Sequence, residues 1–370
     1  MINTLSAAAD AENRRGHVTL AEIRQQPDLW ETTLAGIKNR ALHPSFQGRT
    51  AIVCGAGTSA YAASAVAGAW ARAVAIPTTD LLLYSKREIL QIVPDFAIDG
   101  LLVSLARSGD SPESTGVVER FARLFPDAKQ LAITCNERGR LAQFSGVDAI
   151  VLDPRTNDRS LVMTSSFSNL VLAGLALVQE TTLIEWLPRI CERVKTSLAT
   201  IEALAKRLAV EAPDRFVVLA SADLLPLARE ACLKVLEMTA GRVVSLAETF
   251  LGLRHGPMSF VRPDSLVLCV LSNDKHKRRY EEDLLRELRH KKLGRLLVVG
   301  RPDDSSIAAQ VSIPAMAPEL PDDLRTPFEI VFPQLLAYHL SLAANLDPDS
   351  PSPDGVITRV VEEFQVHDGT

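Results

Sequence analysis

Residues 227–255 read LAREACLKVLEMTAGRVVSLAETFLGLRH, and the rest of the chain can be understood from this stretch. Its first half predicts a helix, because Leu, Ala, Glu, Lys and Met dominate it and Gly241 offers a C-terminal stop. Glu230, Lys234 and Glu237 are spaced i, i+4 and i+7, so at roughly 100° per residue they share a stripe about 60° wide. A solvated edge with one ion pair would show the same spacing. Because almost every other side chain of this helix is apolar, we favour a charged stripe that faces a pocket.

Working outward from this helix, the chain contains two similar halves. Three apolar strand patterns recur at a shift of 165 positions: 51–55 at 216–220, 101–106 at 266–271, and 131–134 at 296–299. The apolar helix predicted at 164–179 has a counterpart at 328–346. Strands that alternate with helices indicate parallel sheets covered on both faces. The sequence therefore predicts an α/β fold of two tandem three-layer αβα units with parallel sheets, preceded by an N-terminal helix.

This repeat divides the chain into four predicted segments. They are an N-terminal helical segment at 1–47, a first unit at 48–195, a second unit at 196–346 and a C-terminal tail at 347–370. In the first segment we expect Thr19 to cap a helix that runs to about Arg40. In the first unit we expect a helix from Ala60 to about Val74 and a strand near Thr78–Tyr84. The Pro- and Asp-rich tail is expected to wrap the surface, where it can also close over a site.

A glycine and serine turn follows the first predicted strand of the first unit. It reads Gly55-Ala-Gly-Thr-Ser59 and precedes a helix rich in small residues. A strand, a glycine turn and a helix N-terminus form an anion site, because free N–H groups and the helix dipole point the same way. The match to a dinucleotide fingerprint is partial, since Ala60 occupies the third glycine position. Thr58 and Ser59 instead favour a small phosphate or sugar hydroxyls.

A second turn of this kind follows the strand at 101–105. Ser108 and Ser111 supply hydroxyl groups, Gly109 lets the backbone approach a ligand closely, and Arg107 offers a charged fork for phosphate oxygens. A simple capping loop would also contain Ser and Asp. Because the carboxyl ends of parallel strands open at one edge of a sheet, we expect both turns to lie at that edge, which favours an anion site over a simple capping loop.

Composition excludes several other classes of protein. The chain has 370 residues, 47% hydrophobic residues and a net charge of −5, which describes a globular domain without the basic surplus of a nucleic-acid-binding protein. The apolar run at 170–178 is too short to span a bilayer, and residues 1–16 contain no apolar signal-peptide core. The five cysteines lack CxxC spacing, so we expect free thiols in a cytoplasmic protein, with no metal and no cofactor.

Five motifs together resemble the double SIS (sugar isomerase) proteins over about residues 45–346. They are Gly55–Ser59, Arg107–Ser114, Met163–Phe167, Glu230–Glu237 and Arg254–Pro257. Within that class the chain is most similar to the tagatose-6-phosphate ketose/aldose isomerase-like group, which includes galactosamine-6-phosphate deaminases. Residues 156–166, residues 251–257 and the tail motif Pro351-Ser-Pro-Asp-Gly355 support this subgroup. A more distant resemblance is to the isomerase half of glucosamine-6-phosphate synthase.

The resemblance implies roles for individual residues. The catalytic glutamate, lysine and histidine of the synthase fall on Glu237, Lys234 and His255, and its phosphate turn falls on residues 106–111. Ala106 replaces a serine of that turn, so one phosphate donor is missing, and Arg107 is available to compensate. The residues expected to bind substrate are Gly57, Thr58, Ser59, Arg107, Ser108, Gly109, Ser111, Thr164, Ser165 and Glu230. The resemblance also implies a homodimer with shared active sites, in which His255 reaches the neighbouring subunit.

The resulting hypothesis is a phosphosugar isomerase that acts on a hexose or amino-hexose 6-phosphate by metal-independent proton transfer, with or without deamination. The glutaminase half of the synthase has no counterpart in this chain, which favours deamination or plain isomerisation over amination. Two alternatives remain at this point: a deglycase that cleaves an amino-acid-linked sugar phosphate, and a non-catalytic sugar-phosphate sensor. Residues 1–45 are too few and insufficiently basic for the DNA-binding helix-turn-helix that such sensors usually carry.

Overall fold

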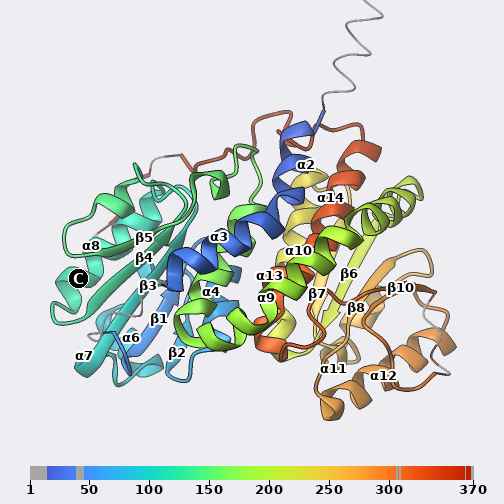
Figure 1. Cartoon of the computed structure of the whole chain (residues 1–370), viewed down its shortest axis with the longest axis horizontal. Helices are drawn as coiled ribbons and strands as arrows, with labels where there is room; N and C mark the ends of the chain where they lie inside the picture. The colour runs from blue at the N-terminus through green and yellow to red at the C-terminus, as the bar shows by residue number, and fades with distance from the viewer. Residues whose placement is uncertain (1–14, 39–45, 306, 308–309, 363, 368–370) are drawn as a thin grey trace, which may run out of the picture.

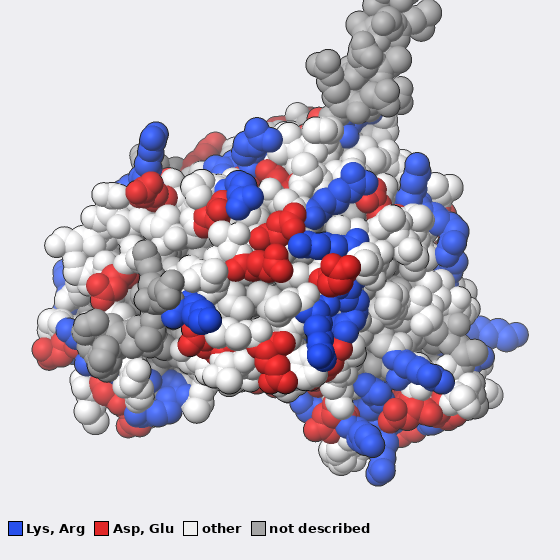
Figure 2. Space-filling view, in the orientation of Figure 1, with Lys and Arg blue, Asp and Glu red and all other residues white. Residues whose placement is uncertain are grey.

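The computed structural model of the chain describes residues 15–38, 46–305, 307, 310–362 and 364–367. Two parallel sheets lie side by side, each with helices on both faces, and a group of helices fills the space between them (Figure 1). On the face seen in Figure 2, basic and acidic side chains are interspersed. The predicted fold class, two tandem α/β units, is confirmed.

The first sheet has five parallel strands in the order β2-β1-β3-β4-β5. Its strands are β1 (Thr50–Cys54), β2 (Ala73–Ala75), β3 (Gly100–Ala106), β4 (Lys129–Thr134) and β5 (Asp148–Val151). Its helices are α4 (Thr58–Gly68), α5 (Thr78–Leu83), α6 (Lys86–Ile92), α7 (Phe96–Asp99) and α8 (Pro112–Leu124), with 3-10 turns at Arg140–Gln143 and Pro154–Thr156. Every residue of β1 and β3 is buried, as expected for central strands covered on both faces.

The second sheet repeats this winding in the order β10-β9-β8-β6-β7. Its strands are β6 (Arg215–Ala220), β7 (Val244–Glu248), β8 (Leu266–Val270), β9 (Arg295–Val299) and β10 (Val311–Ile313). Its helices are α10 (Leu225–Met238), α11 (Phe250–Leu253), α12 (Lys275–His290), α13 (Thr326–Glu329) and α14 (Val331–Ala343), with 3-10 turns at Ala222–Leu224, Pro257–Phe260 and Asp322–Leu324. The first strand of each unit pairs with the second and third, so the two units share one topology.

Helix α9 (Ser165–Val210) joins the two units and bends at Gln179, whose backbone is not helical (φ −128°, ψ 30°). It therefore contains the apolar helix predicted at 164–179, and the predicted boundary between residues 195 and 196 falls inside it. By length and composition α9 is long and apolar enough to cross a membrane, but half of its apolar window is buried in this fold. It packs against α3 (Gln26–Lys38) and α14.

The N-terminal helical segment consists of two consecutive helices. Helix α2 (His17–Arg24) precedes α3, and residues 39–40 of the predicted helix lie outside the described residues. The prediction that Thr19 caps this helix was wrong, because Thr19 lies inside α2. Asp349 of the tail supplies the missing acceptor, at 2.7 Å from the Thr19 backbone nitrogen and 3.1 Å from that of Val18. The tail thus satisfies free N–H groups of the first helix.

Two predictions in the first unit were also wrong. Residues 78–83 form helix α5 rather than a strand, and the edge strand is the three-residue β2. Within the leucine run Leu81 is fully buried and Leu82 is half-buried against the same core, whereas Leu83 is 80% exposed. A short apolar run fits a helix and a strand equally well, and three residues are too few to show an alternating pattern. Helix α4 accordingly ends at Gly68, before the predicted Val74.

Candidate active site

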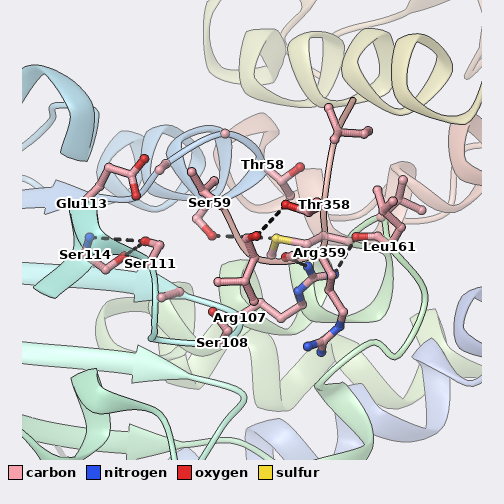
Figure 3. Close-up of a pocket in the computed structure, with 18 of the residues that line it drawn as sticks. Thr58, Ser59, Arg107, Ser108, Ser111, Glu113, Ser114, Leu161, Thr358 and Arg359 are labelled. Atoms are coloured by element: carbon pink, nitrogen blue, oxygen red, sulfur yellow. Dashed lines mark hydrogen bonds between the residues drawn. The ribbon is translucent and has the colours of Figure 1, made fainter. Parts of the chain in front are cut away.

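A cavity of about 520 Å³ opens at the carboxyl ends of β1 and β3. The strand order of the first sheet reverses at this point, which is where open parallel sheets bind their ligands. Seven of the predicted site residues line it: Gly57, Thr58, Ser59, Arg107, Ser108, Ser111 and Glu237. Figure 3 shows the labelled serines, Thr58 and Arg107 around this cavity. Six of the seven come from the first unit, and Glu237 comes from α10 of the second.

The two turns depend on glycines. A Cβ atom at Gly55 would lie 2.4 Å from the backbone oxygen of Ser59, so a side chain cannot fit. Gly57 and Gly109 have positive φ angles of 55° and 72°, where residues with side chains are strained. Gly109 is not among the residues of the described cavity wall, so it determines the backbone conformation of the second turn without lining the cavity. The Ser111 hydroxyl caps α8 by accepting the Ser114 N–H at 3.3 Å.

The charged stripe of α10 is buried between the two units. The side chains of Glu230 and Lys234 have no exposed surface, and that of Glu237 is 25% exposed. Lys234 Nζ donates to the Thr58 hydroxyl at 3.1 Å, lies 3.4 Å from Glu230 Oε1 and donates to Glu237. A buried ammonium requires such partners, because its charge is costly without them. The alternative of a solvated edge is excluded, because Glu230 and Lys234 are fully buried, and of the three residues Glu237 reaches the described cavity wall.

Burial and neighbouring charges shift the pKa values of both Glu230 and Lys234. Burial raises the pKa of Glu230 to about 8, although Lys234 acts in the opposite direction. For Lys234, burial lowers the pKa, but the carboxyl groups of Glu230 and Glu237 outweigh burial and the net direction is upward. Lys234 therefore remains an ammonium at neutral pH, and Glu230 is largely protonated. The carboxyl group of Glu237, which Lys234 also contacts, lies on the cavity wall.

Arg107 and Arg359 together clasp the C-terminal tail against residues 157–161 at one side of the cavity (Figure 3). The Arg107 guanidinium donates to the carbonyl oxygens of Leu161 at 3.0 Å and Arg359 at 2.6 Å. The Arg359 guanidinium donates to the carbonyl oxygen of Asp158, at 2.9 Å from Nε, and to the Asn157 side chain. Burial lowers the pKa of Arg107, but a guanidinium stays charged in proteins. Because these partners are neutral oxygens, both positive charges remain available to an anion in the cavity.

The C-terminal tail forms one wall of the cavity. Residues 355–362 all line it, and Arg359 holds the tail in place through the clasp. The predicted closure of the tail over a site agrees with this placement. The sequence analysis did not find Arg359 as a site residue, because an arginine after a Pro- and Asp-rich segment carries no local signal of a contact with Arg107.

Comparison with known proteins agrees with this architecture. No family model matches the chain. The AgaS protein of Streptomyces coelicolor is 34% identical, over 94% of this chain and 95% of its own. The D-galactosamine-6-phosphate deaminase AgaS of Shewanella sp. (strain ANA-3) is 33% identical, over 99% and 95%. The chain belongs to the AgaS family. The predicted class of enzyme, a phosphosugar isomerase or deaminase, is thereby confirmed.

Solved structures place the AgaS family within the expected fold. The tagatose-6-phosphate ketose/aldose isomerase of Escherichia coli is 31% identical with a TM-score of 0.81, covering 92% of this chain and 96% of that chain. The C-terminal domain of glucosamine-fructose-6-phosphate aminotransferase from Francisella tularensis is 18% identical with a TM-score of 0.72, covering 91% and 99%, and this likeness concerns the fold alone. The predicted SIS architecture is therefore confirmed.

Six predicted site residues of this AgaS-family chain are absent from the described cavity wall: Gly109 and Lys234, which adjoin or contact wall residues, and four others. Glu230 lies behind Lys234, and His255 is exposed on the segment that follows α11. Thr164 and Ser165 are fully buried at the start of α9, where their backbone and hydroxyl groups donate to Asp158. Asp158 thus caps α9, and the two hydroxyls serve this capping network.

Proposed function

We propose that the protein converts galactosamine 6-phosphate into tagatose 6-phosphate and ammonia. The observation that carries this proposal is that Glu237, the two serine turns and Arg107 line one cavity, since a proton-transfer group and an anion site are then within reach of one small ligand. The names of the AgaS relatives support the amino-sugar substrate.

The phosphate binds at the Ser108–Ser111 turn and at the N-terminus of α4, next to Thr58 and Ser59. Hydroxyl donors and a helix N-terminus stabilise a dianion, and the positive charges of Arg107 and Arg359, whose hydrogen bonds go to neutral oxygens, add to the attraction. Binding the phosphate fixes the sugar relative to α10, so proton transfer becomes effectively intramolecular.

In this mechanism Glu237 removes the C2 proton of the open-chain amino sugar and returns a proton to C1. The intermediate is an enolamine, and its negative charge develops next to the Lys234 ammonium. The product of reprotonation is an imine at C2, which water hydrolyses to a ketone with loss of ammonia. Glu237 suits this role because its carboxylate is on the cavity wall and contacts Lys234.

The decisive assay is ammonia release from galactosamine 6-phosphate and glucosamine 6-phosphate by purified protein. Glu237→Gln should lower the rate at least about 10²-fold, as expected for loss of a general base. Normal turnover by Glu237→Gln would refute the assignment of the base. Glu248→Gln is a matched control, since Glu248 is a partly buried carboxylate outside the described cavity wall.

A second reaction, aldose–ketose isomerisation without loss of nitrogen, is favoured by the structural likeness to the tagatose-6-phosphate ketose/aldose isomerase of Escherichia coli. It uses the same base and the same phosphate site, with an enediol in place of the enolamine. Interconversion of sugar phosphates without ammonia release would support this second reaction over deamination.

We also infer that the enzyme is a homodimer in the cytoplasm. His255 is exposed and stands away from the described wall of its own cavity, which suits a residue that assists ring opening in the neighbouring subunit's site. All five cysteines are free and buried, as is usual in a reducing compartment. Mixed dimers of Glu237→Gln and His255→Ala subunits should regain part of the activity, and a lack of rescue after subunit exchange would contradict shared sites.

A further inference from the structure

Glu113 is a carboxylate in the cavity wall that the proposed mechanism does not use. It is only 8% exposed, and it lies in the first turn of α8 between Ser111 and Ser114. Its Oε2 atom is buried and has no hydrogen-bond partner within the described part of the chain. Figure 3 shows Glu113 at the Ser111–Ser114 end of the cavity, away from Leu161 and Arg359.

Helix stabilisation alone does not explain this placement. A negative charge in the first turn of a helix is favourable, but the gain is small and a solvated carboxylate provides it equally well. A buried acceptor without a donor costs more than this gain. The burial of Glu113 is therefore best explained by a donor that arrives with the ligand.

We propose that Glu113 accepts a hydrogen bond from the C4 hydroxyl of the bound sugar phosphate and so selects between C4 epimers. This inference rests on the proposed function, since it places the phosphate at the Ser108–Ser111 turn. In a hexose 6-phosphate the phosphate is on C6, so a group next to the phosphate site meets the C5 and C4 substituents first. In the pyranose form, which binds before the ring opens, the C5 oxygen is the ring oxygen and carries no hydrogen, which leaves the C4 hydroxyl as the first donor.

The charge of the cavity is compatible with this role. A carboxylate close to a phosphate dianion is repelled by it, and nearby positive charge must offset that repulsion. Arg107 and Arg359, whose guanidinium groups contact neutral oxygens, supply two positive charges in the same cavity. An ionised carboxylate only accepts hydrogen bonds, so it distinguishes a hydroxyl that points toward it from one that points away.

Binding measurements test this proposal without depending on the reaction. Isothermal calorimetry would compare galactose 6-phosphate, glucose 6-phosphate and inorganic phosphate on the wild type and on Glu113→Ala. We expect Glu113→Ala to weaken the better-bound epimer by about 10- to 100-fold, the range of one hydrogen bond to a charged group, and to bring the two epimers close together. Inorganic phosphate should bind no more weakly to Glu113→Ala than to the wild type, because it lacks the hydroxyl and is no longer repelled by the carboxylate.

Two further variants complete the design. Glu119→Ala is the matched control, because Glu119 is an exposed carboxylate on the same helix, and it should bind all three ligands like the wild type. Glu113→Gln keeps the size and one acceptor oxygen, so it should weaken the same epimer by a smaller factor, and it provides the test if Glu113→Ala does not fold.

The results separate this proposal from the proposed function. An unchanged epimer ratio in Glu113→Ala or Glu113→Gln would overturn the role of Glu113, as would an equal loss of inorganic phosphate binding or a wild type that binds both epimers equally. Sugar phosphate binding that survives Ser108→Ala would show that the phosphate lies elsewhere, which overturns both proposals. A wild type that binds one epimer but releases no ammonia would refute deamination and leave the role of Glu113 intact.

Discussion

Replacing Lys234 with methionine removes the ammonium from the interface between the two units while keeping most of the side-chain volume. Lys234 contacts Thr58, Glu230 and Glu237, and it has no exposed surface. Loss of one partner from a buried ion pair typically costs about 3–5 kcal/mol, because the remaining charge is left uncompensated. The cost of Lys234→Met should depend on pH, since the pKa of Glu230 is about 8.

The sign and the size of this pH dependence follow from linkage. At pH 6 the Glu230 carboxyl is protonated in both proteins, so its protonation contributes nothing to the difference between them. Without Lys234 the pKa of Glu230 rises further, because the nearest cation is gone. At pH 9 the variant then holds a proton that the wild type has lost. The loss in free energy of unfolding caused by Lys234→Met therefore grows by about 1.4 kcal/mol for each pH unit above the wild-type pKa of Glu230. Between pH 6 and pH 9 it grows by roughly 1 kcal/mol.

The measurement is the thermal midpoint of wild type and Lys234→Met at pH 6 and pH 9. A change of 1 kcal/mol corresponds to about 2–4 °C for domains of 150–250 residues, so the growth of the penalty is measurable. The matched control is the same substitution in a Glu230→Gln background, where the pH-dependent part should vanish. A penalty of equal size at both pH values, or one that keeps its pH dependence in the Glu230→Gln background, would refute the argument.

Two more predictions concern the surroundings of the cavity. Burial and the nearby Asp158 raise the pKa of Glu22 from 4.5 to about 7, so the folded protein keeps a proton that the unfolded chain loses, and the free energy of unfolding should decrease as pH rises between these values. In Glu22→Gln the free energy of unfolding, measured by urea titration, should decrease over this pH range by up to about 3 kcal/mol less than in the wild type. The same pH dependence in variant and wild type would contradict the role of Glu22. Deletion of residues 355–370 removes one wall of the cavity, so we expect KM for the sugar phosphate to rise at least about 10-fold while Asp349 still anchors α2. An unchanged KM in steady-state assays would show that the tail contributes nothing to binding.

The parts of this site that the sequence predicted are those with a local or periodic signal. The turn at Gly55–Ser59 and the spacing of Glu230, Lys234 and Glu237 on one helix face can be recognised within a few residues. The repeat at 165 positions predicts that both units share one winding, and parallel sheets then bring the two turns to one edge. These features needed no knowledge of distant contacts.

The missed parts depend on contacts between distant segments. The bond from Arg107 to the Arg359 carbonyl joins residues 252 positions apart, and it requires the path of a tail without regular structure. Thr164 and Ser165 look like ligand-binding residues in isolation, but Asp158 accepts their hydrogen bonds. The sequence alone does not show whether a hydroxyl already has an acceptor, because that depends on how the loop at 158–164 folds.

The second unit has the same topology as the first. At the carboxyl end of β8, which corresponds to that of β3, an internal carboxylate occupies the position where the first unit is proposed to bind an anion. Ser272 and Asn273 follow β8 at the positions that Arg107 and Ser108 occupy after β3, shifted by 165. The Asp322 carboxylate accepts from the Ser272 hydroxyl and, at 2.8 Å, from the Asn273 backbone nitrogen, and Arg325 pairs with it at 2.9 Å. An internal anion therefore already satisfies the donors of the second turn. This contrast supports the proposal that the first unit binds the external anion while the second unit supplies the α10 stripe.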